Sequence, residues 1–131
     1  MSSIHKGIET LCYSIIEKYK PLMFLDAHGI TVEYSDKIPE EYSMWCEPKF
    51  PYFDAVISYG DSAINSFNEY KNNKKAQRNI FEQYIIHEMA HIITAGLADK
   101  AKQRYVSENE IIREHETLTD HIMKIIVKLH K

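Results

Sequence analysis

Cysteine is scarce in this chain of 131 residues, which contains only Cys12 and Cys46. These two residues are far apart and do not form the close spacing of a CxxC motif or a zinc ribbon. A small secreted scaffold held together by disulfides normally contains many more cysteines. We therefore expect two free thiols in a cytoplasmic protein, with a Cys12–Cys46 disulfide as the less favoured alternative.

A large excess of charge of one sign is also missing. The sequence has 16 Lys and Arg against 19 Asp and Glu, so its formal net charge is −3. This balance gives no electrostatic argument for nucleic acid or an anionic membrane, and we expect neither as a partner. The first twenty residues have Glu9 and Glu17 among their apolar residues, so they predict no signal peptide or membrane span.

Internal repeats and low-complexity tracts are absent from the sequence as well. A chain of this length is large enough to bury a core without disulfides or other cross-links, and too short for a second domain. We therefore expect a single domain over residues 1–131, whose oligomeric state the sequence does not indicate.

The most informative stretch is the apolar segment Phe81–Ile93, where His87, Glu88 and His91 form the pattern HExxH. On a helix, two histidines four residues apart lie on one face and can bind one zinc ion. The glutamate can then reach a water molecule on the same ion. The surrounding residues are apolar nearly all round, which is typical of a buried helix. A metal is favoured because unpaired polar groups would be costly there, and the alternative is hydrogen-bonded core histidines with a capping-type glutamate.

The remaining pattern predicts an α+β fold with a small two- to three-stranded sheet, antiparallel or mixed. The apolar residues recur at spacings of three and four in helices and alternate in strands. The expected elements are a helix from Ser2 or Ser3 to Tyr19, a strand over Ile30–Tyr34, an edge or irregular strand over Tyr42–Glu47, a strand over Tyr52–Gly60, a short helix from Asp61 or Ser62 to Tyr70, a buried metal helix from about Lys75 to about Leu97, and a long C-terminal helix to about Leu129.

Single residues add local expectations to this outline. Gly96 is typical of a helix stop, and residues 98–104 beyond it should be exposed. Ser107 and Glu110 form a capping-box pattern that begins the last helix. Trp45 is expected in the core.

A catalytic zinc usually has three protein ligands and one position for water, so His87 and His91 need a companion. The metzincin pattern is excluded, because it requires Gly and His where this chain has Thr94 and Leu97. The last helix offers several candidates, of which Glu116 and Asp120 share one face because they are four residues apart. These candidates are Glu114, His115, Glu116, Asp120 and His121.

The run His115–Ile126 resembles the second zinc helix of the thermolysin-like gluzincins, whose pattern is ExxxD. This resemblance implies that Glu116 is the third zinc ligand and that Asp120 orients a ligand histidine from the second shell of the site. It covers only residues 81–91 and 115–126, and the chain is closer in size to compact single-domain zincins. His115 stands where larger members often have Asn, so it remains a rival ligand. The resemblance also places Thr119 on the zinc side and buries Leu118, Ile122, Ile125 and Ile126.

The resemblance implies a zinc-dependent metallopeptidase, a hydrolase that acts on a protein or peptide substrate. In such a site zinc activates a water molecule and Glu88 accepts its proton as the catalytic general base. Tyr105, His115 and His121 are candidates for the donor that stabilises the transition state. In that family a sheet edge strand commonly pairs with the substrate, and Tyr52–Tyr59 is our choice for it.

Two other functions remain open at this point. One is a zincin-fold binding or structural module that a metal stabilises without catalysis. The other is a non-proteolytic hydrolase that uses the same water molecule. The presence of Glu88 favours an enzyme, because a purely structural zinc site has no use for a base.

Overall fold

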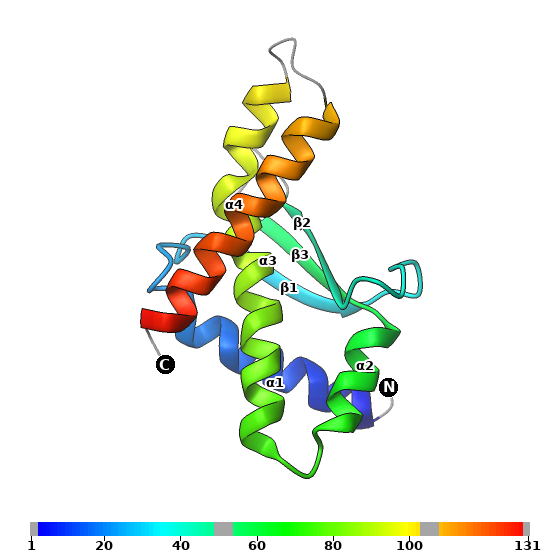
Figure 1. Ribbon diagram of the computed structural model, residues 1–131. Coiled ribbons are helices and arrows are strands. Elements are labelled where there is room, and N and C mark those ends of the chain that lie inside the picture. Colours follow the sequence, from blue (N-terminus) through cyan, green and yellow to red (C-terminus); the bar gives the residue numbers. More distant parts are fainter. Residues whose placement is uncertain (1–2, 49–53, 103–107, 130–131) are drawn as a thin grey trace.

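The computed structural model describes residues 3–48, 54–102 and 108–129. Helices and a small sheet follow one another along these residues, and the predicted α+β class is confirmed (Figure 1). The order is α1 (Ser3–Tyr19), β1 (Gly29–Tyr34), β2 (Met44–Pro48), β3 (Asp54–Tyr59), α2 (Asp61–Glu69), α3 (Lys74–Lys102) and α4 (Glu108–Leu129).

The sheet is mixed, with β3 between the other two strands. β1 pairs with β3 in parallel, and β2 pairs with β3 antiparallel. We expected Tyr52–Tyr59 to form the edge strand beside the site, and this is wrong because β3 is paired on both sides. The strand at the edge is β2, whose short length and terminal Pro48 are typical of an edge position.

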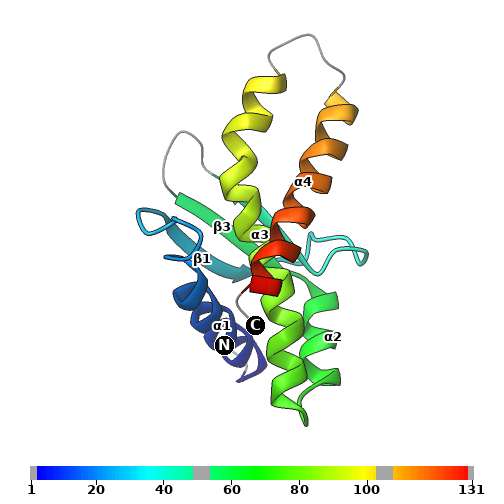
Figure 2. The same ribbon diagram turned by 60° about the vertical axis from the view of Figure 1, so that its left-hand side comes forward.

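The core lies between one face of the sheet and the helices. Ala55, Ile57 and Tyr59 of β3 are buried in one cluster with Ile15 of α1 and Phe81 of α3. Figure 2 shows α1 and the first half of α3 side by side beneath the sheet. Alternation along the strands therefore directs every second residue toward these helices and the others away from them.

This alternation overturns the expectation for Trp45. Met44 is buried and faces the helices, whereas the Trp45 residue is 51 % exposed on the opposite face of β2. The indole packs against Tyr42 instead, with ring centroids 6.0 Å apart. Its size and apolar character suggested burial, but its position in the strand decides the outcome.

The helix that contains the HExxH motif is longer than expected. α3 continues through Gly96 to Lys102, so the predicted stop at Gly96 is wrong. One glycine inside a helix costs only about 1 kcal/mol relative to alanine, which packing of a neighbouring helix can offset. Figures 1 and 2 both show the end of α3 and the start of α4 as an antiparallel pair that projects beyond the sheet. The predicted cap at Ser107 lies outside the described residues.

α4 packs on α3 through a narrower face than the resemblance implied. Thr119 is fully buried and Met123 is 8 % exposed, whereas Leu118 and Ile125 are exposed. The expectation that these two apolar residues are buried is therefore wrong, because they lie about a quarter turn or more from the face that meets α3. Ile122 and Ile126 are partly buried at the margin of that face.

Within the described ranges, no helix combines the length and the apolar character that crossing a membrane requires.

Candidate metal centre

One face of α3 presents the HExxH residues together. The rings of His87 and His91 are edge to face, with centroids 4.9 Å apart. A ligand atom from each of His87, Glu88 and His91 lies within 4.8 Å of the others. The opposite side of this helix segment is anchored in the core by Ile85 and Met89, which are fully buried. The helix therefore holds three polar side chains on one side without relying on a flexible loop.

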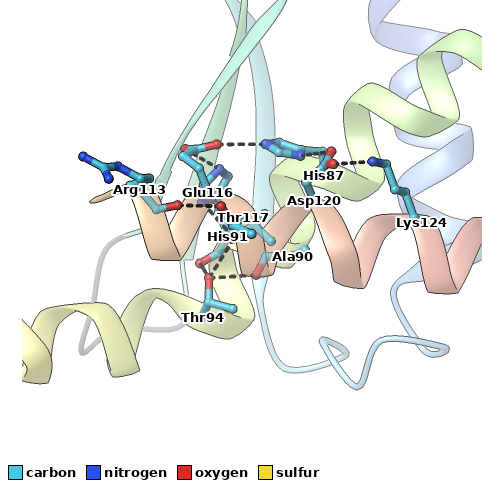
Figure 3. Close-up of polar contacts among 10 residues, drawn as sticks. His87, Ala90, His91, Thr94, Arg113, Glu116, Thr117, Asp120 and Lys124 are labelled. Carbon is cyan, nitrogen blue, oxygen red and sulfur yellow. Dashed lines mark hydrogen bonds and ion pairs between the residues drawn. The ribbon is translucent and has the colours of Figure 1, made fainter. Parts of the chain in front are cut away.

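Glu116 of α4 reaches both histidines (Figure 3). Its Oε2 lies 3.3 Å from His87 Nε2, and its Oε1 lies 3.1 Å from His91 Nε2. Ligand atoms on a tetrahedral zinc with bonds of about 2.0–2.1 Å stand about 3.3–3.4 Å apart. The two separations are close to that value, and two imidazoles with one carboxylate are a donor set that zinc prefers. These residues therefore fit a zinc ion.

Asp120 stands behind His87, one turn after Glu116. Its Oδ1 lies 3.6 Å from His87 Nδ1, and its Oδ2 lies 2.9 Å from the Lys124 ammonium. The hydrogen bond from Lys124 lowers the pKa of the Asp120 carboxyl, and the nearby His87 contributes in the same direction. An ionised carboxylate at this place can hold the His87 proton on Nδ1 and leave Nε2 facing Glu116.

Glu88 is the most enclosed acid of the group. It is 6 % exposed, and burial followed by the charge of Glu116 raises its pKa from 4.5 to about 8. Burial disfavours a charged carboxylate, as does a second negative charge nearby. A bound divalent cation would act in the opposite direction, because positive charge favours ionisation. The environment thus gives Glu88 a proton affinity far from that of an exposed glutamate.

A cleft of about 790 Å³ opens beside these residues. β2 and the residues just before it form one wall, and α3 and α4 form the other. Its described lining is Glu41, Tyr42, Ser43, Met44, Trp45, Cys46, Gln83, Tyr84, His87, Glu88, His91, Ile112, Glu116, Asp120 and Met123.

The sequence interpretation missed several of these lining residues. Gln83 and Tyr84 lie one turn before His87 and Glu88, so helical spacing could have placed them on the same face. Tyr42 and Cys46 could not have been found in this way, because they reach the cleft only through the pairing of β2 with β3. The expectation of free thiols is confirmed for Cys12 and Cys46. Burial and the charge of Glu88 raise the pKa of the Cys46 thiol.

Of the other predicted candidates, none whose side chain the structure describes lies at the centre. His121 is exposed and lies with Lys124 and Leu118 along a shallow groove on α4. Tyr105 and the side chains of Glu114 and His115 lie outside the described part of the structure. The arrangement therefore places one of the predicted third ligands, Glu116, against the histidines.

Comparisons with protein-family models, with curated proteins and with solved structures found no match for this chain.

Proposed function

We propose that this chain is a zinc-dependent metallopeptidase of the gluzincin type, a hydrolase that cleaves peptide bonds in a protein or peptide substrate. The observation that carries the proposal is the position of Glu116, whose two oxygens lie 3.3 Å and 3.1 Å from the Nε2 atoms of His87 and His91. These residues come from two helices, yet their separations match those of ligands on one zinc ion. Glu88 is buried beside them and can act as a base, which a purely structural zinc site would not need.

Each residue of the centre has a separate role in this proposal. His87, His91 and Glu116 hold the ion, and Asp120 fixes the orientation of His87. When bound, zinc would supply a Lewis acid that polarises the scissile carbonyl and lowers the pKa of a water molecule. Glu88 accepts the proton of the attacking water molecule and passes it to the leaving amine.

The edge strand β2 is the substrate-binding element that we propose in place of β3. The amide of Gly60 donates to the carbonyl of Ser43 at 3.1 Å, so these residues form a hydrogen-bonded antiparallel pair. Backbone groups alternate along such a ladder, which directs those of Met44 and Cys46 away from β3. These residues line the cleft, so an extended peptide that pairs with them lies next to His87 and His91.

The free thiols support a reducing compartment, and we propose the cytoplasm.

The first test is the zinc content of protein purified without added metal. We expect about one zinc per chain, and replacement of a ligand in His87→Ala, His91→Ala or Glu116→Ala should remove it. Glu17→Gln is the control, because Glu17 is exposed on α1 and is not among the residues that line the cleft. Zinc retained by Glu116→Ala would transfer the third-ligand role to another residue, with His115 as the first candidate.

The second test separates an enzyme from a metal-stabilised module. Glu88→Gln keeps the size of the side chain and removes the base, so fold and zinc content should be unchanged. Cleavage of a peptide library, read by mass spectrometry, should fall by about 10²–10⁴-fold. Glu17→Gln, on the exposed surface of α1, should remain within a few-fold of the wild type. If zinc-loaded wild type cuts no more than Glu88→Gln, a binding module or a non-proteolytic hydrolase becomes the better account.

A further inference from the structure

Behind His91, on the side away from Glu116, lie two buried threonines. Thr119 of α4 is fully buried, and Thr94 of α3 is 5 % exposed. Thr119 Oγ1 lies 3.5 Å from His91 Nδ1 and 3.2 Å from Thr94 Oγ1. Thr94 Oγ1 in turn lies 3.3 Å from the carbonyl oxygen of Ala90 and 3.4 Å from that of His91 (Figure 3). The imidazole is thus joined to the backbone of its own helix through two hydroxyl groups.

The backbone carbonyl groups at the end of this series of hydrogen bonds set the direction of all of them. A carbonyl oxygen only accepts, so Thr94 is the donor in its hydrogen bonds to the carbonyl groups of Ala90 and His91. Thr94 then accepts from Thr119, and Thr119 has its own oxygen left to accept from His91 Nδ1–H. This direction agrees with Nε2 of His91 facing Glu116, because a neutral imidazole with its proton on Nδ1 presents the Nε2 lone pair there.

We propose that Thr119, supported by Thr94, is a positioning residue for the metal centre that holds His91 as the Nδ1–H tautomer with Nε2 toward the metal. The inference rests on the proposed zinc site but not on peptide cleavage. The two histidines are then oriented by different chemistry. His87 faces the ionised carboxylate of Asp120, whereas His91 faces a neutral hydroxyl, and both devices come from α4 at adjacent positions.

A purely structural role for Thr119 makes a different prediction. In that case its methyl group fills the contact between α3 and α4, and the hydroxyl only satisfies Thr94. Thr119→Val keeps the shape and removes the hydroxyl, whereas Thr119→Ser keeps the hydroxyl and removes the methyl. If Thr119 positions His91, zinc affinity depends on the hydroxyl. If Thr119 only packs between the helices, stability depends on the methyl group and zinc affinity does not depend on the hydroxyl.

The experiment measures zinc affinity by competition with a chromophoric chelator, together with the melting temperature of the metal-free protein. We expect Thr119→Val to weaken zinc binding by about 10–100-fold, the range seen when partners of ligand histidines are removed. Its metal-free melting temperature should fall by a few degrees, because the buried Thr94 hydroxyl and His91 Nδ1–H each lose a hydrogen-bond partner. We expect Thr119→Ser to lose several degrees of melting temperature and to keep zinc affinity within about three-fold of the wild type.

Thr117→Val is the matched control on the same helix. Thr117 is exposed, and its hydroxyl donates to the carbonyl of Arg113 at 2.9 Å, one turn back along α4. The substitution therefore removes a threonine hydroxyl without touching His91, and zinc affinity should remain that of the wild type.

A spectroscopic measurement reports the tautomer itself. In zinc-loaded wild type and Thr119→Ser, long-range ¹H–¹⁵N spectra should show the His91 proton on Nδ1 in slow exchange with water. In Thr119→Val this proton should exchange faster. Wild-type zinc affinity and an unchanged Nδ1 proton in Thr119→Val would overturn the inference. Zinc binding by the wild type without any peptide cleavage would instead reject the proposed activity and leave this inference standing.

Discussion

At the scale of single residues, the proposed centre depends on the groups placed behind the ligands, and Asp120 is the charged one. Asp120 lies 3.6 Å from His87 Nδ1 and is kept ionised by Lys124. Such a partner fixes the ring and makes its other nitrogen a better donor, although it does not touch the metal. Its removal should therefore weaken metal binding without removing a ligand.

We predict that Asp120→Asn lowers zinc affinity by about 10–100-fold and leaves the stoichiometry at one. The amide keeps the shape but loses the charge that faces His87. Isothermal titration with zinc checks the affinity, and Asp26→Asn at an exposed position serves as the control. Equal affinities in Asp120→Asn and the wild type would contradict the role given to Asp120.

Phe24 is a residue whose backbone conformation is costly. It has a φ angle of 58° and is 90 % exposed in the turn after α1. The left-handed region costs a residue with a side chain about 1–2 kcal/mol, a penalty that glycine avoids. We predict that Phe24→Gly raises the free energy of unfolding by about 0.5–1 kcal/mol in urea denaturation.

Leu22→Gly is the comparison for this turn, because Leu22 is also exposed but has no positive φ. Glycine there should be neutral or destabilising. If the two glycine variants lose stability equally, the strain assigned to Phe24 is absent.

At the scale of elements, periodicity predicted most of the fold but not how the strands are arranged. The helices and strands of the described residues correspond to stretches whose apolar spacing was visible in the sequence. The strand order was not visible, because it depends on hydrogen bonds between residues distant along the chain. The wrong predictions for Trp45 and for the edge strand of the sheet both result from this missing information.

The candidate ligands were predicted more fully than their surroundings. The spacing of His87 and His91 on one helix is a local property, and the resemblance supplied Glu116 and Asp120. The approach of β2 to the cleft and the contact of Thr119 with His91 arise only when α3 packs against β2 and α4. Such contacts leave no periodic signal in one sequence.

The exposed face of β2 provides a test at this scale. We predict that Trp45→Thr lowers the free energy of unfolding by less than about 1 kcal/mol, because threonine suits an exposed strand position. Phe81→Ala, in the fully buried part of α3, should cost about 3–5 kcal/mol. Equal losses in urea denaturation would place Trp45 in the core and contradict the described arrangement of the sheet.

At the scale of the whole molecule, the proposed metal would join the two helices that project from the sheet. His87 and His91 belong to α3, whereas Glu116 belongs to α4, so an ion held by all three resists their separation. An ion that binds only the folded chain stabilises it by RT ln(1 + [L]/Kd), or about 2.7 kcal/mol at a free concentration of 100 Kd. If the proposed site binds zinc, the ion should therefore also stabilise the fold.

We predict that saturating zinc raises the melting temperature of the wild type by several degrees and that chelation reverses the change. Differential scanning calorimetry of metal-free and zinc-loaded protein measures this shift. Glu116→Ala should show little of it, because the link to α4 is lost. A full zinc shift in Glu116→Ala would show that the metal does not join the two helices through this residue.

The most direct measurement for the central claim is a crystal structure of the zinc-loaded protein with anomalous data at the zinc edge. The account predicts one zinc at about 2.0–2.2 Å from His87 Nε2, His91 Nε2 and a Glu116 oxygen. Its fourth position should be open to water, with Glu88 beside that water and not on the metal. A zinc bound by four protein ligands, with Cys46 or Glu88 closing the site, would contradict the catalytic account.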